Sequence, residues 1–527
     1  MSLAPERAPR SGFPPVTTAG WAILGAIVAL GAILRGVLFA QPPGGFLAYN
    51  EGFYIGLAHR MQSTGVFSWF FKPLDFNNPP LYVAMLSTLY RFHVPAVVGG
   101  RLISVGAGIG SIVVTFLIGR LLYDERTGLA AAAVLAVMPG AVLVDHNIEV
   151  DSLFVFLLFS AVYFYVLSIK SDRTVHAGTG GVLLGLSILT KQPAILALPA
   201  LALWEVWRTH GVGWARTRRA SAFALAALAV GLSWYVWQLA TSAQAFLGSV
   251  AQIGGRSSFR EAGYFFWTIV LGRELMWMVF PLAAVVALAG LIFVAWERKA
   301  GDKLVLVIAA TYIAYYVQYH FHSYYLLPLA PVVALAIGRL FMGLAQTRGL
   351  LRLRIALLAV LVVAMCFGSF MMMAEKKWGL WSPATIPSPA TASAAPWLYV
   401  SPEAEGLFGP ALSLIGNGRG QQQIDLRSFL SLPARETSQA YLLYGGQIVS
   451  RAGTKAPPRA VLSETHYRPV LFGYRIDVEP PTVTTNTQFF ANPPWSPTSV
   501  GPPWYFGVER LNADSGWYLY DNYSFGR

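Results

Sequence analysis

The chain has 527 residues, of which 55% are hydrophobic and only 12% are charged. Soluble proteins carry about 25% charged residues, so this composition excludes a soluble globular protein and indicates a membrane protein. The formal net charge is +13, but the basic residues form short clusters between apolar runs, which is typical of a membrane topology signal and argues against a nucleic-acid partner.

Apolar runs near the bilayer-crossing length of about 20 residues recur through the first three quarters of the chain. They predict a mainly α-helical, polytopic bundle of eleven spans. We expect the first run to be retained as a helix, because Gln41-Pro42-Pro43 follows it in place of a small-residue cleavage site. The predicted spans are residues 20–40, 99–119, 128–145, 152–169, 177–191, 193–207, 220–240, 265–295, 304–319, 324–342 and 353–373.

Basic clusters fall on alternate loops of this eleven-span order, so all of them lie on one side. The positive-inside rule identifies that side as cytoplasmic. The N-terminus is then cytoplasmic, and the chain from Glu375 onward is extracytoplasmic. The clusters are Arg7 and Arg10; Arg120 and Arg126; Lys170 and Arg173; Arg208, Arg216, Arg218 and Arg219; Arg298, Lys299 and Lys303; and Arg339, Arg348, Arg352 and Arg354.

Residues 177–207 fit either one long tilted helix or a hairpin of two short spans. Both flanks are basic, which favours the hairpin. Its tip, Thr190-Lys191-Gln192-Pro193, places a lysine near the outer face of the membrane. A lone lysine at a helix end often extends only to the lipid headgroups, and that simpler interpretation of Lys191 stays open here.

The first outer loop, residues 41–98, is long for a connection and predicts a functional loop. It contains a helix-like stretch over 51–62, and Asn78-Pro79-Pro80 opens a second one, since proline suits the first turn of a helix. We expect both helices to lie at the membrane interface. Glu51 begins the first of them, where an acid also simply favours the helix dipole.

The second outer loop concentrates polar residues between two spans. Ionisable residues at membrane depth are costly and tend to be functional. Glu149 and Asp151 stand two apart at a helix start, whereas capping needs only one acid, which favours a functional role. His146 is more typical of an interfacial partner than of a ligand. The polar set is Asp145, His146, Asn147, Glu149 and Asp151.

A later outer loop contains His320 and His322, followed by Tyr324 and Tyr325. An interfacial aromatic belt explains the tyrosines, and a His-x-His pair alone is weak evidence for a metal. Taken together, the outer loops gather carboxylates and cations while the inner loops are only basic. This asymmetry predicts an active site at the extracytoplasmic face.

The C-terminal quarter differs in composition. Residues 1–375 form the predicted membrane domain, 376–396 a Ser-, Thr-, Ala- and Pro-rich linker, and 397–527 a small extracytoplasmic α/β domain. Its aromatic tail could stack on sugar rings, although core packing is the commoner role. Cys366 is the only cysteine, so no intrachain disulfide forms. Strand-like runs are Trp397–Val400, Gln439–Tyr444, Pro469–Val478 and Trp517–Tyr520.

Four ordered motifs resemble the GT-C fold of polyprenyl-phosphate-sugar glycosyltransferases. The likeness is strongest to the bacterial branch related to protein O-mannosyltransferases and lipid A aminoarabinose transferases. The motifs cover residues 20 to about 340. They are Asn50-Glu51-Gly52-Phe53-Tyr54 with Ala58-His59-Arg60-Met61, Asn78-Pro79-Pro80-Leu81-Tyr82, Leu189-Thr190-Lys191-Gln192-Pro193, and Tyr324-Tyr325-Leu326-Leu327-Pro328-Leu329.

Two positions depart from the family pattern. Asn50 stands where the family has the first acid of an Asp-Glu pair, and an amide cannot take a proton. Asn78 stands where a lysine commonly precedes Pro-Pro-Leu. Lys191, Lys72 or Arg273 would have to supply the missing cation.

The resemblance implies that a sugar passes from an undecaprenyl-type phosphate to an acceptor hydroxyl outside the bacterial inner membrane, with inversion at the sugar carbon. A base, a cation for the departing phosphate and an apolar groove are needed. It suggests Glu51 as the base, Glu149 and Asp151 as acceptor-orienting or alternative base residues, and Lys191 as the phosphate partner. Further expected substrate-binding residues are Asn50, Tyr54, Lys72, Asn78, Tyr82, His146, Arg273, His322, Tyr324 and Tyr325.

A monophosphate leaving group can be served by lysine or arginine, so no cofactor is expected. However, Glu149-Val150-Asp151 also resembles the acid-x-acid pair that binds a divalent cation in oligosaccharyltransferases, and a metal stays an alternative. The expected partners are the lipid-linked sugar donor, membrane lipids and an acceptor protein, lipid or glycan. The resemblance names no particular sugar, acceptor or oligomeric state.

Two other functions are compatible with the composition. A many-helix protein with intramembrane prolines and charges could be a transporter or flippase, but the halves show no paired repeat and polar residues gather in the outer loops. A non-catalytic relative that only binds lipid-linked sugar is the second, because Asn50 and Asn78 replace expected functional groups.

Overall fold

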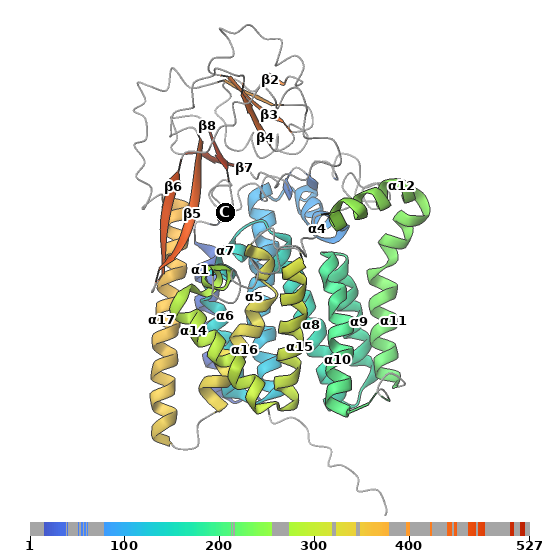
Figure 1. Ribbon diagram of the computed structural model, residues 1–527, viewed down its shortest axis with the longest axis vertical. Helices are drawn as coiled ribbons and strands as arrows, with labels where there is room; N and C mark the ends of the chain where they lie inside the picture. Colours follow the sequence, from blue (N-terminus) through green and yellow to red (C-terminus); the bar gives the residue numbers. More distant parts are fainter. Residues whose placement is uncertain are drawn as a thin grey trace, which may run out of the picture.

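The computed structural model places a bundle of upright helices below a group of strands (Figure 1). It describes residues 15–37, 39, 51, 54, 55, 57, 58, 61, 78–211, 213, 217–255, 273–318, 323–343 and 348–378, and eight strands between 397 and 521.

A helix lies within each of the eleven predicted spans. The helices are α1 (Thr18–Gly36), α4 (Pro80–Arg91), α5 (Ala96–Leu122), α6 (Glu125–Ala136), α7 (Pro139–His146), α8 (Val150–Ser171), α9 (Thr174–Ile188), α10 (Ala197–Thr209), α11 (Arg218–Gly231), α12 (Ser233–Gly255), α14 (Arg273–Glu297), α15 (Ala300–Gln318), α16 (Leu329–Gly343) and α17 (Arg348–Trp378), with the short 3₁₀ helices η1 (Gln192–Leu196) and η4 (Ser323–Leu326).

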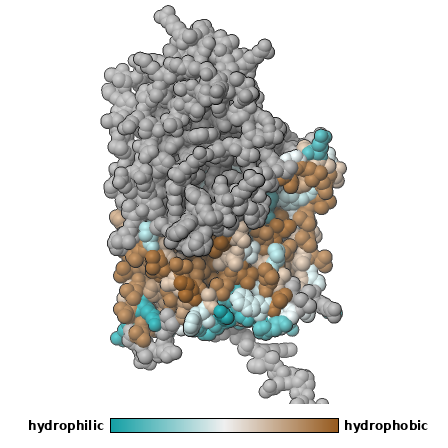
Figure 2. All heavy atoms as spheres, viewed as in Figure 1, coloured by the Kyte–Doolittle hydropathy of each residue, from teal (hydrophilic) through white to brown (hydrophobic). Residues whose placement is uncertain are grey.

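The bundle is that of a multi-pass membrane protein, and the face seen in Figure 2 is mostly hydrophobic over the helices. Among the described residues, 4 helices are long and apolar enough to cross a membrane alone. They become 6 when two bent pairs, α6 with α7 and α11 with α12, each count as one span. The count of eleven therefore stays a prediction.

The predicted basic loops meet at one end of the bundle, the lower end in Figure 1. There Thr17 binds Glu125, Arg219 pairs with Asp172, and the Lys303 ammonium donates to the Trp207 carbonyl at 3.1 Å. These contacts join helix ends that are far apart in the sequence. They agree with the predicted gathering of positive charge on one side, while the assignment of that side to the cytoplasm stays a prediction.

The predicted hairpin break near Lys191 is present. α9 ends at Ile188, and η1 and α10 follow after Leu189–Lys191, so one continuous tilted helix is excluded. The Leu81 backbone N–H donates to the Leu189 carbonyl at 3.0 Å. This bond fixes the start of α4, which begins at Pro80 as predicted, against the hairpin tip.

Helices α5, α6 and α16 approach closely through glycines, as is common where membrane helices pack. A Cβ added at Gly128 would lie 2.6 Å from the Phe116 carbonyl oxygen, and one at Gly338 would lie 2.9 Å from the Thr127 carbonyl oxygen. Such contacts leave no room for a methyl group unless the backbones separate.

The first prediction concerns this glycine contact. Gly128→Ala should lower the free energy of unfolding by about 1–3 kcal/mol, since the added methyl group overpacks the helix contact. Thermal unfolding in detergent measures it. Gly106→Ala on the neighbouring helix α5 is the control, because Gly106 is exposed and a Cβ there meets nothing within 4 Å. Equal melting temperatures for both variants would contradict the close packing.

The strands form two sheets of four, with orders β2-β1-β3-β4 and β6-β5-β8-β7. The predicted runs at Trp397, Gln439 and Trp517 correspond to β1, β3 and β8. The predicted single run Pro469–Val478 is wrong in its extent, because the chain turns back after Val470 to pair β5 with β6. The strands are β1 (Trp397–Val400), β2 (Gln422–Gln423), β3 (Ala440–Tyr444), β4 (Gln447–Ser450), β5 (Leu462–Val470), β6 (Gly473–Glu479), β7 (Phe506–Arg510) and β8 (Trp517–Asp521).

The sheet of β5 and β6 lies beside the upper end of α17 (Figure 1). The domain and linker boundaries proposed from composition remain predictions.

Candidate functional site

The site is built around the turn between α7 and α8, residues 145–151. The Asn147 side-chain amide donates to the Leu143 carbonyl at 2.6 Å and closes the end of α7. Glu149 is the N-cap of α8, and its carboxylate accepts the Val150 backbone N–H at 3.1 Å. Asp151 then occupies the first turn of α8, where exposed N–H groups favour a negative charge.

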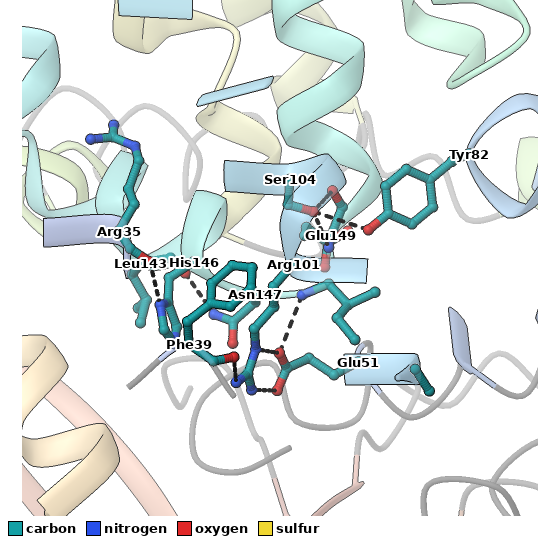
Figure 3. A network of polar contacts seen from close by, with 12 residues as sticks. Arg35, Phe39, Glu51, Tyr82, Arg101, Ser104, Leu143, His146, Asn147 and Glu149 are labelled. Carbon is teal, nitrogen blue, oxygen red and sulfur yellow. Dashed lines mark hydrogen bonds and ion pairs between the residues drawn. The ribbon is translucent and has the colours of Figure 1, made fainter. Parts of the chain in front are cut away.

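Glu51 is bound from two sides. Arg101 on α5 donates to both carboxylate oxygens, at 2.8 and 3.0 Å, and neither side chain is exposed. The Ile148 backbone N–H donates to Glu51 Oε1 at 3.2 Å (Figure 3). Glu51 therefore links the first outer loop to α5 and to the 145–151 turn.

The described residues of the stretch 51–61 are helical and buried. Tyr54, Ile55, Leu57, Ala58 and Met61 pack with residues of α4 and α5 and with the start of α8. This packing covers the turn from the outer side.

A second buried ion pair holds the other end of the turn. Arg35 at the end of α1 binds Asp145 at 2.9 Å, and its side chain is fully buried. The same guanidinium donates to the Ala136 carbonyl at 2.8 Å, where α6 ends and the chain bends by 61° into α7. His146 Nδ1 lies 2.8 Å from the Arg35 carbonyl (Figure 3). Arg35 thus satisfies carbonyls that the bend would leave unpaired.

A set of hydroxyl groups lies over the turn. The Tyr82 hydroxyl and Ser104 Oγ lie 3.0 Å apart. Ser104 Oγ accepts the Glu149 backbone N–H and donates to the Glu149 carbonyl, each at 3.1 Å. The Tyr54 ring packs edge-on against Tyr82, and its hydroxyl donates to Asn78 at 3.4 Å.

Tyr54 is held as a neutral phenol. Burial raises the pKa of Tyr54 well above its usual value, and the carboxylates of Glu149 and Asp151 raise it further. A phenol that keeps its proton can donate a hydrogen bond but cannot serve as a base.

The hairpin-tip lysine faces the first turn of α8. Lys191 Nζ lies 2.7 and 2.6 Å from the two oxygens of Asp151. The Lys191 side chain is 15% exposed, whereas that of Asp151 is 1% exposed. The ammonium also lies 4.2 Å from the Tyr325 ring centroid and 5.7 Å from that of Tyr324. Both rings come from η4, so three separate segments meet here.

The structure brings most of the predicted site residues together. Those of the first two outer loops, the hairpin tip and η4 surround one turn. His146 instead points toward α1, and Asn50, Lys72 and His322 lie outside the described residues, as does the side chain of Arg273. The residues brought together are Glu51, Tyr54, Asn78, Tyr82, Glu149, Asp151, Lys191, Tyr324 and Tyr325.

Two residues that contribute most to the geometry, Arg35 and Arg101, were not predicted. Each is an arginine within or beside an apolar run, and an intramembrane arginine needs a partner. That requirement was the available signal, although the sequence alone does not name the partner.

The carboxylate of Asp151 in the acid pair is already engaged in this arrangement. Asp151 gives both oxygens to an ammonium, and a divalent cation would have to displace it. Over the part of the chain that the structure describes, no group of three or more His, Cys, Asp or Glu side chains could hold a metal ion.

The second prediction tests the Glu51–Arg101 clamp. Arg101→Met strands a buried carboxylate and should lower the free energy of unfolding by about 3–5 kcal/mol. Adding Glu51→Gln removes that charge and should recover much of the loss. Thermal unfolding of both variants is the measurement, with the exposed Arg126→Met as a control that changes little. A double variant no more stable than Arg101→Met would contradict the pairing.

Part of the chain matches a known protein family. Residues 77–237 match the model of a family described as dolichyl-phosphate-mannose-protein mannosyltransferase. This segment contains Glu149, Asp151 and Lys191. No curated protein sequence matches the chain.

One solved structure shows the same fold, and two others are less similar. The structure of ArnT from Cupriavidus metallidurans bound to undecaprenyl phosphate matches with a TM-score of 0.53 and 16% identity, covering 78% of this chain and 87% of that one. The oligosaccharyltransferase of Archaeoglobus fulgidus in complex with Zn and sulfate matches with a TM-score of 0.49 and 16% identity, covering 74% of this chain and 61% of that one. The S. cerevisiae protein O-mannosyltransferase Pmt1–Pmt2 complex bound to the sugar donor matches with a TM-score of 0.34 and 17% identity, covering 44% of this chain and 34% of that one.

The fold assignment rests on the first of these structures. Together with the family-model match, it confirms the expected likeness to GT-C glycosyltransferases related to protein O-mannosyltransferases and ArnT.

Proposed function

We propose that this chain is a membrane glycosyltransferase that moves a sugar from an undecaprenyl-type phosphate to an acceptor hydroxyl at the outer face of a bacterial inner membrane. The observation that carries the proposal is the meeting of Asp151, Lys191 and Tyr325 at the end of the bundle opposite the basic loops. The structure of ArnT with undecaprenyl phosphate on a similar fold supports the choice of donor.

The reaction needs three things that these residues can supply. A carboxylate must take the proton of the attacking hydroxyl, which typically contributes about 10²–10⁴ in rate. A cation must stabilise the charge that develops on the departing phosphate. Lys191 is the cation, and its partial exposure lets a lipid headgroup reach it. Direct displacement by the acceptor oxygen would invert the sugar carbon.

Two acids are candidates for the base. Glu51 accepts hydrogen bonds from Arg101 on both oxygens and from the Ile148 backbone N–H. Asp151 has one counter-ion, and that lysine is mobile compared with a buried arginine fork. The geometry therefore favours Asp151 as the base, with Glu51 holding the turn in place.

The acceptor side is formed by neutral donors. Tyr54 and Tyr82 carry hydroxyl groups beside Glu149, and Tyr54 keeps its proton. In this proposal they orient the acceptor hydroxyl or the sugar, while the soluble C-terminal strands contribute to acceptor recognition.

The third prediction tests the transferase activity. Purified protein in lipid nanodiscs should consume a radiolabelled polyprenyl-phosphate sugar and release the lipid phosphate. Lys191→Gln should reduce turnover by about 100- to 1,000-fold, which is the usual cost of losing one group that stabilises a developing negative charge. Lys299→Gln, an exposed lysine at the opposite end, is the matched control. Movement of intact lipid-linked sugar across the bilayer without turnover would favour a flippase instead.

The fourth prediction concerns metal use. Because Lys191 already neutralises Asp151, transfer should continue at an unchanged rate after treatment with EDTA. The measurement is the same turnover assay before and after chelation. A loss of turnover that Mg²⁺ or Mn²⁺ reverses would show that a metal ion stabilises the charge of the departing phosphate. It would contradict the proposal that Lys191 alone does so.

A further inference from the structure

The ammonium group of Lys191 gives most of its hydrogen-bonding capacity to Asp151. An ammonium carries three N–H donors. Two of them reach Asp151, at 2.7 and 2.6 Å, and the Tyr325 ring face lies 4.2 Å from Nζ. A phosphate that takes more than one N–H of this cation must therefore take the place of a carboxylate oxygen.

The two anions approach the lysine from different sides. Asp151 is 1% exposed and fixed in the first turn of α8, whereas the lysine side chain is 15% exposed. A headgroup that arrives from outside meets the ammonium before it meets the carboxylate. Lysine has a flexible four-carbon stem, so the ammonium can turn outward while the carboxylate stays in place.

We propose that the donor phosphate displaces Asp151 from Lys191, and that the released carboxylate then accepts the proton of the acceptor hydroxyl. This inference rests on the proposed function and adds a regulation to it: the base becomes available only when the donor is bound. Transfer is therefore ordered, with the donor before the acceptor.

The chemical step balances within the residues described. The acceptor O–H bond breaks and its proton goes to Asp151. The acceptor oxygen forms a bond to the sugar carbon as the bond from that carbon to the phosphate oxygen breaks. The electron pair remains on the phosphate, where Lys191 faces it. When the lipid phosphate leaves, Asp151 returns its proton to water and binds Lys191 again.

Burial supplies the driving force for the proton transfer. A buried carboxylate that loses its counter-ion is unfavourable by several kcal/mol. Accepting a proton removes the charge and with it that cost. Without donor, Lys191 pairs with Asp151, so this carboxylate is not available as a base in the resting site.

The first test is the affinity for undecaprenyl phosphate without sugar, measured by quenching of tryptophan fluorescence. Asp151→Asn removes the competing anion, so the variant should bind the lipid phosphate about tenfold more tightly or better, which is about 1.4 kcal/mol. Its transfer rate should nevertheless fall by about 100-fold or more, because the base is lost. Equal or weaker binding by Asp151→Asn would overturn the exchange.

A second variant covers the case in which Asp151→Asn does not fold. Lys191→Arg offers five N–H donors in a rigid fork, so it can hold Asp151 and a phosphate at once. It should bind undecaprenyl phosphate as tightly as the native protein but transfer at least about tenfold more slowly, since general-base catalysis is withheld. Native transfer rates in Lys191→Arg would reject the coupling between donor binding and base release.

Glu205→Gln is the control for both measurements. Glu205 is also a buried carboxylate paired with a cation, Arg208, but it lies at the basic end of the bundle. Its affinity for undecaprenyl phosphate should be that of the native protein. If the native protein neither binds undecaprenyl phosphate nor turns over its sugar derivative, the proposed function fails. If it does both and Asp151→Asn does not bind more tightly, only the exchange fails.

Discussion

The short turn between α7 and α8 depends on three cations that bind it from three directions. In a membrane protein an unpaired ionised group costs several kcal/mol. Three of the carboxylates near this turn, those of Glu51, Asp145 and Asp151, each have their own counter-ion. Two of the cations are arginines with no exposed surface, and the third is a partly exposed lysine. The first two fix the turn, and only the third can exchange partners. The pairs are Arg35–Asp145, Arg101–Glu51 and Lys191–Asp151.

This division of roles explains why the site is rigid where it must be and adjustable at one point. Arg35 also satisfies the carbonyls at the bend after α6, so the direction of α7 and the charge of Asp145 are set by the same group. Ser104 then fixes the backbone of Glu149 through two hydrogen bonds. A polar environment that is already oriented needs little rearrangement when charge moves in a reaction. The lysine stands apart because its stem has no comparable fixation.

The sequence predicted the architecture better than the contacts. Hydropathy located a helix in every predicted span, and Pro80 correctly began α4 because proline fits the first turn. The basic flanks of residues 177–207 correctly predicted the break after α9. The roles of the two buried arginines, Arg35 and Arg101, were not predicted. Their partners lie 110 and 50 residues away in the chain, and hydropathy carries no information on pairing across such separations. The roles assigned to individual acids depend on these partners, so sequence alone could not rank Glu51 against Asp151.

The aromatic face under Lys191 has its own consequence for motion. A ring attracts an ammonium through its quadrupole without accepting one particular N–H in a fixed direction. The Lys191 head can therefore rotate about the last bonds of its stem while Tyr325, 4.2 Å away, continues to attract it. The Tyr325 ring thus keeps the ammonium in place without fixing the directions of its N–H bonds. An aliphatic side chain at residue 325 would remove that support, and every reorientation of the lysine would then begin from a more weakly held cation.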